Sequence, residues 1–467
     1  MPPERSLRHV HFVGIGGIGM SGMAQLLLER GERVSGSDLQ MTPTLARLAA
    51  GGARIFVGHQ AAQVHGADLV VFSSSIAPQN PELVAARNQG IPTWSRATLL
   101  AEFLMGKTSV AVSGAHGKTT TTGLIASILL DAGRDPTILI GGDVARLGGN
   151  ARWGRGPHVV VEADESDGSF VELAPTIAVV TNIDEEHLDY YRNLREIVEA
   201  YEQFVQRMAP GGTLICCGDD PGVQQLLAGA HGPRLTYGLT GAWDLMAESP
   251  QVSGRHATYT ARFKTQRLGQ ITLQIPGLHN VVNSLAAVGA GLTLGCSFEE
   301  IRRALAQYEG AGRRFQARGD VDGIMVVEDY AHHPTEIAAT LQAARTWPRG
   351  RLLCVFQPHR FSRTRYLRDR FSTCFAAADQ VILTEVYAAS EEPMDGIGAA
   401  TLSAAIRASG FQAIEVLARA AIVPALLRTV RAGDTVLVLG AGDIGQVAGE
   451  LVQALEARRA VPEAHAC

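Results

Sequence analysis

Short apolar runs that end in glycine-rich turns constrain the fold of this chain most strongly. The clearest are residues 9–13, followed by the turn 14–19, and residues 109–113, followed by the turn 114–119. Each turn leads into a stretch of helical character, so strands alternate with helices, and this order is typical of a parallel sheet with right-handed crossovers. We therefore expect an α/β fold. At 467 residues the chain is long enough for about three domains.

Further apolar runs extend this pattern along the whole chain. The strand-like runs lie at residues 33–38, 69–72, 158–161, 177–180, 213–216, 325–328, 352–356, 380–383 and 435–439. Residues 231–275 alternate polar and apolar side chains and predict antiparallel strands, and a helix is expected after residues 276–280. We expect domains at residues 1–106, 107–312 and 313–467.

Charge and composition exclude several classes of protein. The net charge is −5, and no basic stripe of the kind that binds nucleic acid is present. No apolar stretch approaches the ~20 residues that span a bilayer, and the N-terminus lacks the pattern of a signal peptide. Six cysteines occur without a CxxC pair, which favours buried, reduced thiols. We expect a soluble cytoplasmic protein with small-molecule partners, no nucleic acid and no membrane.

The first glycine turn has the spacing of a dinucleotide-binding loop. Residues 14–19 match GxGxxG between a strand and a helix, and Asp38 lies 19 residues beyond Gly19, at the end of the next strand. The helix N-terminus favours a phosphate group. Taken alone the loop indicates NAD, but it suits any pyrophosphate, including that of a UDP-sugar, and a turn that binds nothing stays open.

A second GxGxxG occurs at residues 440–445, again after an apolar strand. Asp443 lies inside this loop and would repel a pyrophosphate. We therefore interpret it as a structural turn, or as a contact with a cationic or amine ligand.

The strongest single motif is the turn at residues 114–120. A strict phosphate-binding loop would have glycine at position 112, where this chain has Val112, so the loop is an abbreviated form. The features that bind a nucleotide phosphate are retained: backbone N–H groups can surround phosphates, Lys118 can neutralise their charge and the Thr119 hydroxyl can bind Mg²⁺. The motif predicts ATP binding.

Two acidic segments follow neighbouring strands. Residues 162–167 contain four carboxylates within six residues, an arrangement that is costly unless the groups are solvated or face a cation. Glu165 is the predicted oxygen ligand of Mg²⁺, with a solvated turn as the alternative. His187, in the segment 181–189, is either an exposed histidine at the start of a helix or a ligand of a second Mg²⁺.

Later motifs place further polar groups near strand or helix ends. His279 and Asn283 are four residues apart, on one face of the expected helix, and Asn283 can offer a donor and an acceptor to adenine. The segments 313–315, 328–334 and 357–364 carry arginines and histidines in order. A metal site at His332 and His333 is disfavoured, because adjacent histidines rarely chelate one ion.

The motifs GAHGKTT, EADESDGSF, TNIDEEHLD, PGLHNVVN, GRRF, EDYAHHP and FQPHRFSRT occur in one order along the chain. In that order they resemble the Mur ligase family, and GIGGIGM, DYAHHP and QPHRFSRT resemble its L-alanine-adding branch. The resemblance spans essentially the whole chain. It implies three domains: an N-terminal Rossmann-like UDP-binding domain, a central P-loop ATPase-like domain with a mixed sheet, and a C-terminal Rossmann-like domain.

The resemblance also implies the reaction, the partners and the site residues. The expected substrates are UDP-N-acetylmuramate, L-alanine and ATP, with Mg²⁺ as cofactor, and the chain is expected to be a monomer or a homodimer. The residues expected to contact UDP are Gly16, Gly17, Ile18, Gly19, Asp38, Ser73, Ser74 and Ser75. Those expected to bind ATP are Gly114, Ala115, His116, Gly117, Lys118, Thr119, Thr120, His279, Asn283, Arg314 and Asp329. Those expected to ligate magnesium are Thr119, Glu165 and His187. Those expected to line the amino-acid site are Tyr330, His332, Arg360 and Arg363.

The implied chemistry passes through an acyl phosphate. Lys118 would stabilise the transferring phosphoryl group, His332 is a candidate base for the incoming amine, and Arg360 or Arg363 could clamp the alanine carboxylate. Ala115, Glu328 and Phe361 depart mildly from the usual motifs, where Thr, Asp and Tyr are frequent.

Three other functions stay open from the sequence. A sister ligase that attaches a tripeptide to the same UDP-sugar would share most motifs. An NAD-dependent dehydrogenase built on the first loop would leave Lys118 unexplained. A non-catalytic nucleotide-gated binding protein would leave the intact phosphate and metal set without a use.

Overall fold

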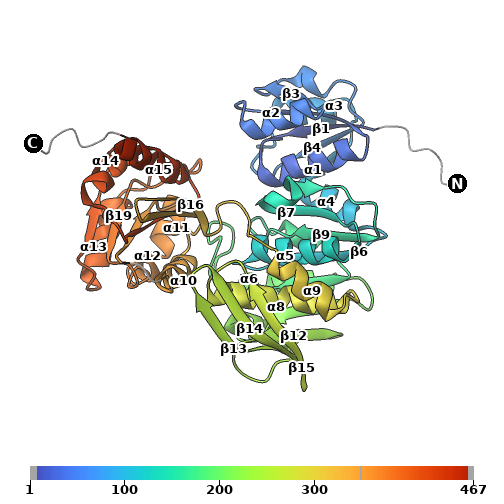
Figure 1. Cartoon of the computed structure of the whole chain (residues 1–467). Helices are drawn as coiled ribbons and strands as arrows, with labels where there is room; N and C mark the ends of the chain where they lie inside the picture. Colours follow the sequence, from blue (N-terminus) through green and yellow to red (C-terminus); the bar gives the residue numbers. More distant parts are fainter. Residues whose placement is uncertain (1–7, 348–349, 461–467) are drawn as a thin grey trace, which may run out of the picture. The chain divides into compact units, whose positions relative to one another are not determined.

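The computed structural model describes residues 8–347 and 350–460 (Figure 1). The described chain divides into two compact units. The first unit holds the described residues up to 184 together with 195–246 and 284–304, and the second holds 185–194, 247–283 and the described residues from 305 onward. Three sheets run through the chain, and they give it the three-domain α/β architecture that the sequence predicts.

The first sheet is parallel and doubly wound. Its strands lie in the order β3-β2-β1-β4-β5. The strands are β1 His9–Val13, β2 Arg33–Asp38, β3 Arg54–Val57, β4 Leu69–Phe72 and β5 Thr93–Ser95. The helices are α1 Ile18–Glu29, α2 Pro43–Ala50, η1 Ala61–Val64, α3 Pro81–Asn88 and α4 Arg96–Leu104. The strand order reverses between β1 and β4, which is where ligands bind in such sheets.

The central sheet follows in the same unit. Its strands β12-β11-β10-β6-β9-β7-β8 are neighbours in this order. They are β6 Thr108–Ser113, β7 Thr137–Val144, β8 Gly149–Arg152, β9 His158–Glu162, β10 Ile177–Val180, β11 Thr213–Cys217 and β12 Arg234–Gly238. The helices are α5 Lys118–Asp131, η2 Ala145–Leu147, η3 Ser169–Glu172, α6 Leu194–Gln206, α7 Pro221–Gly229 and α9 Phe298–Ala306. Strand β6 lies between β9 and β10, so the turns after these three strands share one edge.

The prediction that residues 231–275 are antiparallel is partly wrong. Strand β12 pairs in parallel with β11, because α7 carries the chain back across the sheet between them. Strand β13, Leu245–Ser253, begins in parallel beside β12 through Leu245 and Met246. The prediction holds for the hairpin of β14, His256–Phe263, and β15, Gln266–Leu273, whose strands pair antiparallel.

The sheet of the second unit has the order β16-β17-β21-β18-β19-β20, parallel except for the edge strand β16. The strands are β16 Gln316–Val321, β17 Ile324–Asp329, β18 Leu352–Phe356, β19 Gln380–Leu383, β20 Ile414–Val416 and β21 Thr435–Leu439. The helices are α10 Pro334–Arg345, α11 Phe361–Tyr366, α12 Arg368–Phe371, α13 Ala399–Ala408, α14 Arg419–Thr429 and α15 Gly445–Ala460. Helix α8, Leu278–Thr293, crosses the boundary between the units at residue 283.

Alternate residues of these strands enter two separate cores. Val327, Cys354 and Leu437 belong to the core beneath α10 and α13, while their neighbours Val326 and Val355 belong to the core beneath α14 and α15. Burial on both faces explains why the strands are continuously apolar in the sequence.

Five of the six cysteines lie in the described part of the chain, and all five are free and buried. Cys467 lies outside the described residues. Among the described residues, no helix combines the length and the apolar character needed to cross a membrane.

Candidate active site

The turn after β6 and the start of α5 form a phosphate-binding loop. Gly117 adopts the left-handed conformation at the helix N-cap, with φ 81°, and Lys118 is the first helical residue. The first-turn N–H groups of a helix have no partners within the helix, and its dipole favours an anion there. A strand, a glycine turn and a helix start are thus arranged as a phosphate site requires.

The turn after β10 holds this loop in place. The side chain of Asn182 accepts from the N–H of His116 at 2.8 Å and donates to its carbonyl oxygen at 2.9 Å. Thr181 Oγ1 donates to the same carbonyl at 2.6 Å. A Cβ atom on Gly114, which has φ 140°, would lie 2.0 Å from Thr181 Oγ1. Glycine at position 114 therefore allows the two turns to approach each other.

Lys118 is buried against carboxylates that follow β9. Its Nζ donates to Glu165 Oε1 at 2.8 Å and to the Gly114 carbonyl at 2.7 Å. Burial alone would lower the pKa of Lys118, but Glu165, Asp164 and Glu162 outweigh it and raise that pKa. The ammonium is therefore charged and fixed in direction at the helix start.

The acidic turn also reaches the next residue of the helix. Thr119 Oγ1 donates to Glu162 Oε1 at 3.2 Å, and the second oxygen of Glu162 accepts from the Gly141 N–H at 2.8 Å. Asp164 lies 3.5 Å from Arg96. A hydroxyl and three carboxylates are hard oxygen donors of the kind that Mg²⁺ prefers.

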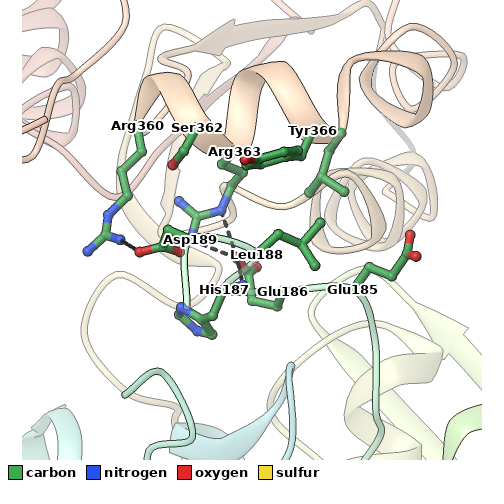
Figure 2. Close-up of a pocket in the computed structure, with 10 residues that line it drawn as sticks. Glu185, Glu186, His187, Leu188, Asp189, Arg360, Ser362, Arg363 and Tyr366 are labelled. Atoms are coloured by element: carbon green, nitrogen blue, oxygen red, sulfur yellow. Dashed lines mark hydrogen bonds and ion pairs between the residues drawn. The ribbon is translucent and has the colours of Figure 1, made fainter. Parts of the chain in front are cut away.

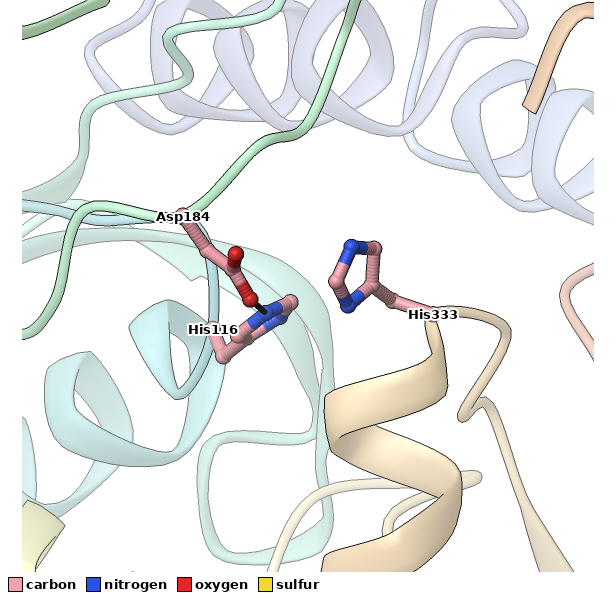
Figure 3. Close-up of side chains that lie close together, drawn as sticks. All are labelled: His116, Asp184 and His333. Atoms are coloured by element: carbon pink, nitrogen blue, oxygen red, sulfur yellow. Dashed lines mark hydrogen bonds and ion pairs between the residues drawn. The ribbon is translucent and has the colours of Figure 1, made fainter. Parts of the chain in front are cut away.

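His116 extends the polar rim of the loop. Its Nε2 lies 3.2 Å from Asp184 Oδ2, at the end of the segment that follows β10 (Figure 3). His333, also drawn in Figure 3, belongs to the second unit, where it caps the N-terminus of α10.

The first glycine loop occupies the switch point of its sheet. Ser37 carbonyl oxygen accepts from the N–H groups of Gly14 and Ile15 at 2.9 and 3.0 Å. Asp38 Oδ2 accepts from the N–H of Gly16 at 2.8 Å. Ser73 follows β4, and its Cβ would lie 3.6 Å from a Cβ on Gly14. The two predicted groups, 16–19 with Asp38 and 73–75, are thus brought together by β1, β2 and β4.

Arg363, in α11, binds Glu186 and His359 within the second unit, and Figure 2 shows its contact with Glu186. Its Nε and Nη2 contact Glu186 Oε1 at 2.8 and 2.7 Å, and its Nη1 donates to the carbonyl and Nδ1 of His359 at 3.1 and 3.0 Å. Burial would raise the pKa of Glu186, but the guanidinium of Arg363 holds it far below its usual range. Arg363 and Glu186 are 8% and 7% exposed, so this is a buried ion pair.

Arg360 lies at the start of the same helix but is held differently (Figure 2). Its Nη1 donates to Asp189 at 2.6 Å, and the two side chains are 33% and 40% exposed. Among the described residues, its Nε has no hydrogen-bond partner. The backbone of Arg360 has φ 68° and ψ 138°, a strained conformation for a residue with a Cβ. Such strain persists where the surrounding structure fixes it, which occurs often at functional sites.

Two imidazoles beside Arg363 are neutral at neutral pH. Burial, together with Arg363, lowers the pKa of His332 to about 4. Burial and the neighbouring cations lower the pKa of His359 to about 3. His332 donates from Nδ1 to the Tyr330 carbonyl at 3.0 Å, so the lone pair of its neutral ring is on Nε2. His359 accepts from Arg363 at Nδ1, so its proton is on Nε2.

Asp329 ends β17 and is buried. Burial raises its pKa to about 6, although Arg314 and the N–H groups of Ala331 and Phe315, at 2.7 and 2.6 Å, act in the opposite direction. The guanidinium of Arg314 lies 5.2 Å from the ring centre of Tyr330.

His279 and Asn283 occupy the first turns of α8. Burial lowers the pKa of His279 to about 4. The amide of Asn283 is buried and donates to Asn280 Oδ1 at 3.2 Å. His187 has φ 54°, and its carbonyl accepts from Tyr190 and Tyr191 at 2.9 Å. The adenine and metal roles of these residues stay predictions.

The second GxGxxG is a structural turn whose cation comes from the chain itself. Arg313 Nη2 donates to the carbonyls of Gly440 and Gly442 at 2.8 and 3.1 Å, and its Nε donates to Glu328 at 2.7 Å. Asp443 accepts from Gln357 at 2.8 Å. The sequence leaves open an external cationic ligand, and Arg313 occupies the carbonyls at which it would bind.

Some residues of these sites carry no signal in the sequence. Asp184, Glu186 and Asp189 stand inside a recognised acidic motif, but nothing there indicates which of them faces an arginine. Glu82 lies in the first turn of α3 and belongs to no motif. Its burial and its contacts with β1 and β2 are visible only in the folded chain.

Comparison with known proteins matches family models along most of the chain. Residues 9–108 match the Mur ligase family, catalytic domain. Residues 112–291 match the Mur ligase middle domain. Residues 313–442 match the Mur ligase, glutamate ligase domain.

Curated relatives and solved structures agree with these matches. Proteins named UDP-N-acetylmuramate–L-alanine ligase from Desulfatibacillum aliphaticivorans and Desulfotalea psychrophila are both 47% identical, over 94% and 97% of this chain and 96% and 99% of their own lengths. The structure of UDP-N-acetylmuramate–alanine ligase from Thermotoga maritima is 30% identical with a TM-score of 0.81, covering 96% of this chain and 99% of that chain. A murein peptide ligase from Psychrobacter arcticus is 25% identical with a TM-score of 0.69, covering 96% and 98%. With all three family models in order and relatives of nearly equal length, the chain belongs to the Mur ligase family.

Proposed function

We propose that this chain joins L-alanine to the carboxylate of UDP-N-acetylmuramate, using ATP, to give UDP-N-acetylmuramoyl-L-alanine, ADP and phosphate. The observation that carries the ATP-dependent step is the buried Lys118 ammonium, held by Glu165 at the start of α5. The nearly full-length relatives at 47% identity carry the name of the L-alanine ligase, and this supports alanine as the amine donor.

A carboxylate is a poor acyl donor because oxide would have to leave. In the first step a carboxylate oxygen of the sugar attacks the γ-phosphorus of ATP, the bond to the bridging oxygen breaks, and ADP leaves. Lys118 and the N–H groups of α5 stabilise the charge on the transferring group, so catalysis is chiefly positioning and electrostatics. The product of this step is an acyl phosphate.

Magnesium suits the donor set that surrounds the loop. Glu165, Glu162 and Asp164 bring three negative charges, while Lys118 offsets one of them. We propose Glu165 and Thr119 as ligands of one Mg²⁺. We propose His187 separately, as a ligand of a second Mg²⁺. A bound dication would supply neutralisation of the phosphate charge.

We propose different roles for the two arginines of α11. Arg360 is half-exposed and binds Asp189 through one hydrogen bond. A substrate carboxylate can replace Asp189 and accept hydrogen bonds from two N–H groups of the guanidinium. Arg363 uses its donors on Glu186 and His359. It therefore positions His359 and the 185–189 segment and does not itself bind alanine.

In the second step the amine nitrogen of L-alanine attacks the acyl carbon. The carbon–oxygen bond to phosphate breaks, an amide forms, and the amine loses a proton. His332 is neutral, with its lone pair on Nε2, so it can accept a proton in the neutral pH range. A pKa of about 4 makes His332 a weak base. It can therefore accept the proton most readily after the amine nitrogen has bonded to the acyl carbon, because that nitrogen is then positively charged and acidic.

The tripeptide-adding sister ligase is the second candidate. It is favoured only by the fold-level and sequence likeness to murein peptide ligases, which are 25% and 29% identical to this chain.

We also propose domains at residues 1–106, 107–312 and 313–467. They would contact UDP, ATP and the amino acid, in that order.

The experiment supplies the purified chain with ATP, Mg²⁺ and UDP-N-acetylmuramate, and adds one amine donor at a time. L-Alanine should give a product whose mass equals that of the UDP-sugar plus one alanine residue. Formation of product only with L-Ala-γ-D-Glu-meso-diaminopimelate would assign the tripeptide reaction instead. Turnover with neither donor would contradict ligase activity.

A further inference from the structure

A buried carboxylate lies beneath the first glycine loop and belongs to no motif. Glu82 is in the first turn of α3, is 0% exposed, and has its side chain directed among three strands. His11, from β1, approaches Glu82 Oε2 at 3.0 Å, and Ser37, from β2, donates to the same oxygen at 2.7 Å. After β3, the N–H of Gln60 donates to Oε1 at 3.2 Å, and His59 Nδ1 lies 3.3 Å from it.

A chain of hydrogen bonds extends from Glu82 to Ser35 and His9. His9 Nδ1 faces the carbonyl of Gly66 at 2.8 Å, so this nitrogen carries a proton. His9 Nε2 and His11 Nδ1 both contact Ser35 Oγ, at 2.7 and 2.8 Å, but the hydroxyl has one hydrogen to give. Whichever histidine Ser35 donates to, the other must donate to it. His11 Nε2 in turn contacts Glu82, so one chain of hydrogen bonds joins Glu82, His11, Ser35 and His9.

The contacts of Glu82 favour its ionised form. Burial alone would raise its pKa, but the hydrogen bonds from His11 and Ser37 outweigh burial and lower it. A buried carboxylate is costly unless each lone pair is used, and such a pair adds little stability over apolar packing. Retention of the charge thus points to a geometric role.

The glycine loop is connected to Glu82 through one residue. Ser37 binds Glu82 with its side chain, and its carbonyl oxygen accepts from the N–H groups of Gly14 and Ile15 at 2.9 and 3.0 Å. The next residue, Asp38, accepts from the N–H of Gly16 at 2.8 Å. The carbonyl of Asp38 also accepts from Gly58, two residues before the Gln60 N–H that binds Glu82. The ends of β1, β2 and β3 are thereby linked at a single carboxylate.

We propose that Glu82 is a positioning residue for substrate binding: through Ser37 it fixes the end of β2, and so the loop 14–16 that receives the UDP group. This role rests on the proposed function, which assigns the UDP group to that loop. Glu82 does not contact substrate, and its effect is confined to the UDP-sugar. The ATP loop begins at residue 114, on a different sheet.

The test compares Glu82→Gln, Ser37→Ala and their double variant in steady-state turnover with each substrate varied. Glutamine keeps the volume but presents an NH₂ group to donors, and loss of a buried hydrogen-bond partner costs on the order of tenfold in affinity. We expect the KM for UDP-N-acetylmuramate to rise about tenfold in each single variant, with kcat and the KM for ATP within twofold. In the double variant, the KM for UDP-N-acetylmuramate should be no higher than in the more impaired single variant, because both changes break the same connection.

Ser95→Ala is the matched control, because it removes a hydroxyl from β5 of the same sheet, where Ser95 caps α4 through Thr98 at 3.0 Å. Its KM for the UDP-sugar should stay within twofold. Binding of UDP alone, measured by calorimetry, gives a readout that does not need turnover. Ser37→Ala retains the pair of Glu82 and His11, so it remains informative if Glu82→Gln fails to fold.

An unchanged KM for the UDP-sugar in both single variants, or strictly additive effects in the double variant, would overturn the positioning role. A fall in kcat and a rise in the KM for ATP of equal size would also overturn it, since it would indicate general loss of structure. A wild-type chain without UDP binding or UDP-sugar-dependent turnover would contradict the proposed function itself.

Discussion

Lys118 Nζ lies 2.8 Å from Glu165 Oε1, at the point where α5 begins. Both groups are largely buried, with side chains 14% and 3% exposed. The ammonium also donates to the Gly114 carbonyl, so its position is fixed by the loop as well as by the acidic turn. The arrangement keeps one positive charge at the helix N-terminus, where the phosphate groups of ATP are expected.

Replacement of Lys118 by methionine should remove the phosphoryl-transfer step. The side-chain volume is retained but the charge is lost, so we expect kcat to fall about a thousandfold while binding of the UDP-sugar stays within twofold. Phosphate release and calorimetric titration with UDP-N-acetylmuramate measure the two effects. Lys107→Met is the control, since the Lys107 ammonium donates to the Gly156 carbonyl in the same unit, away from the loop 114–119. Near-normal ATP turnover in Lys118→Met would rule out the phosphate assignment.

Glu165→Gln should weaken the dependence on magnesium rather than the affinity for the UDP-sugar. One negative oxygen ligand is lost, and we expect the Mg²⁺ concentration at half-maximal rate to rise roughly tenfold. Magnesium titrations at saturating ATP give this value. Glu172→Gln, a change outside the loop, should leave it unchanged. If the two variants respond alike, Glu165 is no ligand.

The proposed contact between Arg360 and the alanine carboxylate can be tested by substrate kinetics. Arg360→Lys removes the planar fork that binds a carboxylate through two N–H groups, so the KM for L-alanine should rise at least tenfold while the KM for ATP stays within twofold. The measurement is initial rate against alanine concentration at saturating ATP. An unchanged KM for alanine would contradict the assignment of the carboxylate to Arg360.

Replacement of Arg363 should lower the free energy of unfolding more than replacement of Arg360. Arg363→Met leaves Glu186 buried without its partner, which costs about 3 kcal/mol or more in the free energy of unfolding. Arg360→Met breaks a half-exposed pair and should cost less than about 1 kcal/mol. Urea unfolding measures both, and the double change Arg363→Met with Glu186→Gln should recover part of the loss. If both single changes lower the free energy of unfolding equally, the Arg363–Glu186 pair contributes no more to stability than the Arg360–Asp189 pair.

Three neutral histidines should make the folded chain sensitive to acid. His279 and His332 have a pKa of about 4 and His359 of about 3, whereas the ordinary value is 6.5. Below pH 6.5 these histidines bind protons in the unfolded chain but not in the folded chain, so their contribution to stability falls as pH is lowered through 6.5 toward 4. Each histidine contributes a slope of roughly 1.4 kcal/mol per pH unit in that window.

Unfolding by urea at pH 7.0, 6.0 and 5.0 gives this slope, and His279→Gln should make it shallower by about one histidine's share. Nitrogen-15 NMR adds an independent check: at pH 5.0, His332 should be protonated on Nδ1 alone and His359 on Nε2 alone. Doubly protonated rings at that pH would contradict the assigned hydrogen bonds.

Local pattern was enough to predict most strands and the two glycine turns that follow β1 and β6. The run at residues 9–13, the glycine turn and Asp38 specify their own geometry, because the contacts involved are short-range or follow from parallel strand order. The parallel pairing of β12 and β13 was not predictable, since alternation of side chains reports burial on one face and not strand direction.

Roles that depend on distant partners were also beyond the sequence. Arg360 and Arg363 stand three residues apart in one motif and look equivalent there. Their difference comes from Asp189 and Glu186, which lie 171 and 177 residues away along the chain. The burial of Glu82 likewise follows from packing of α3 against strands that precede it by more than forty residues.

The central claim is that ATP activates the sugar carboxylate as an acyl phosphate, and oxygen-18 in that carboxylate tests it most directly. The chain is incubated with ATP, Mg²⁺, L-alanine and UDP-N-acetylmuramate labelled at both carboxylate oxygens, and the released phosphate is analysed by mass spectrometry. An acyl phosphate requires one labelled oxygen to pass into each phosphate and the other to remain in the amide. Unlabelled phosphate, released while product forms, would contradict the account.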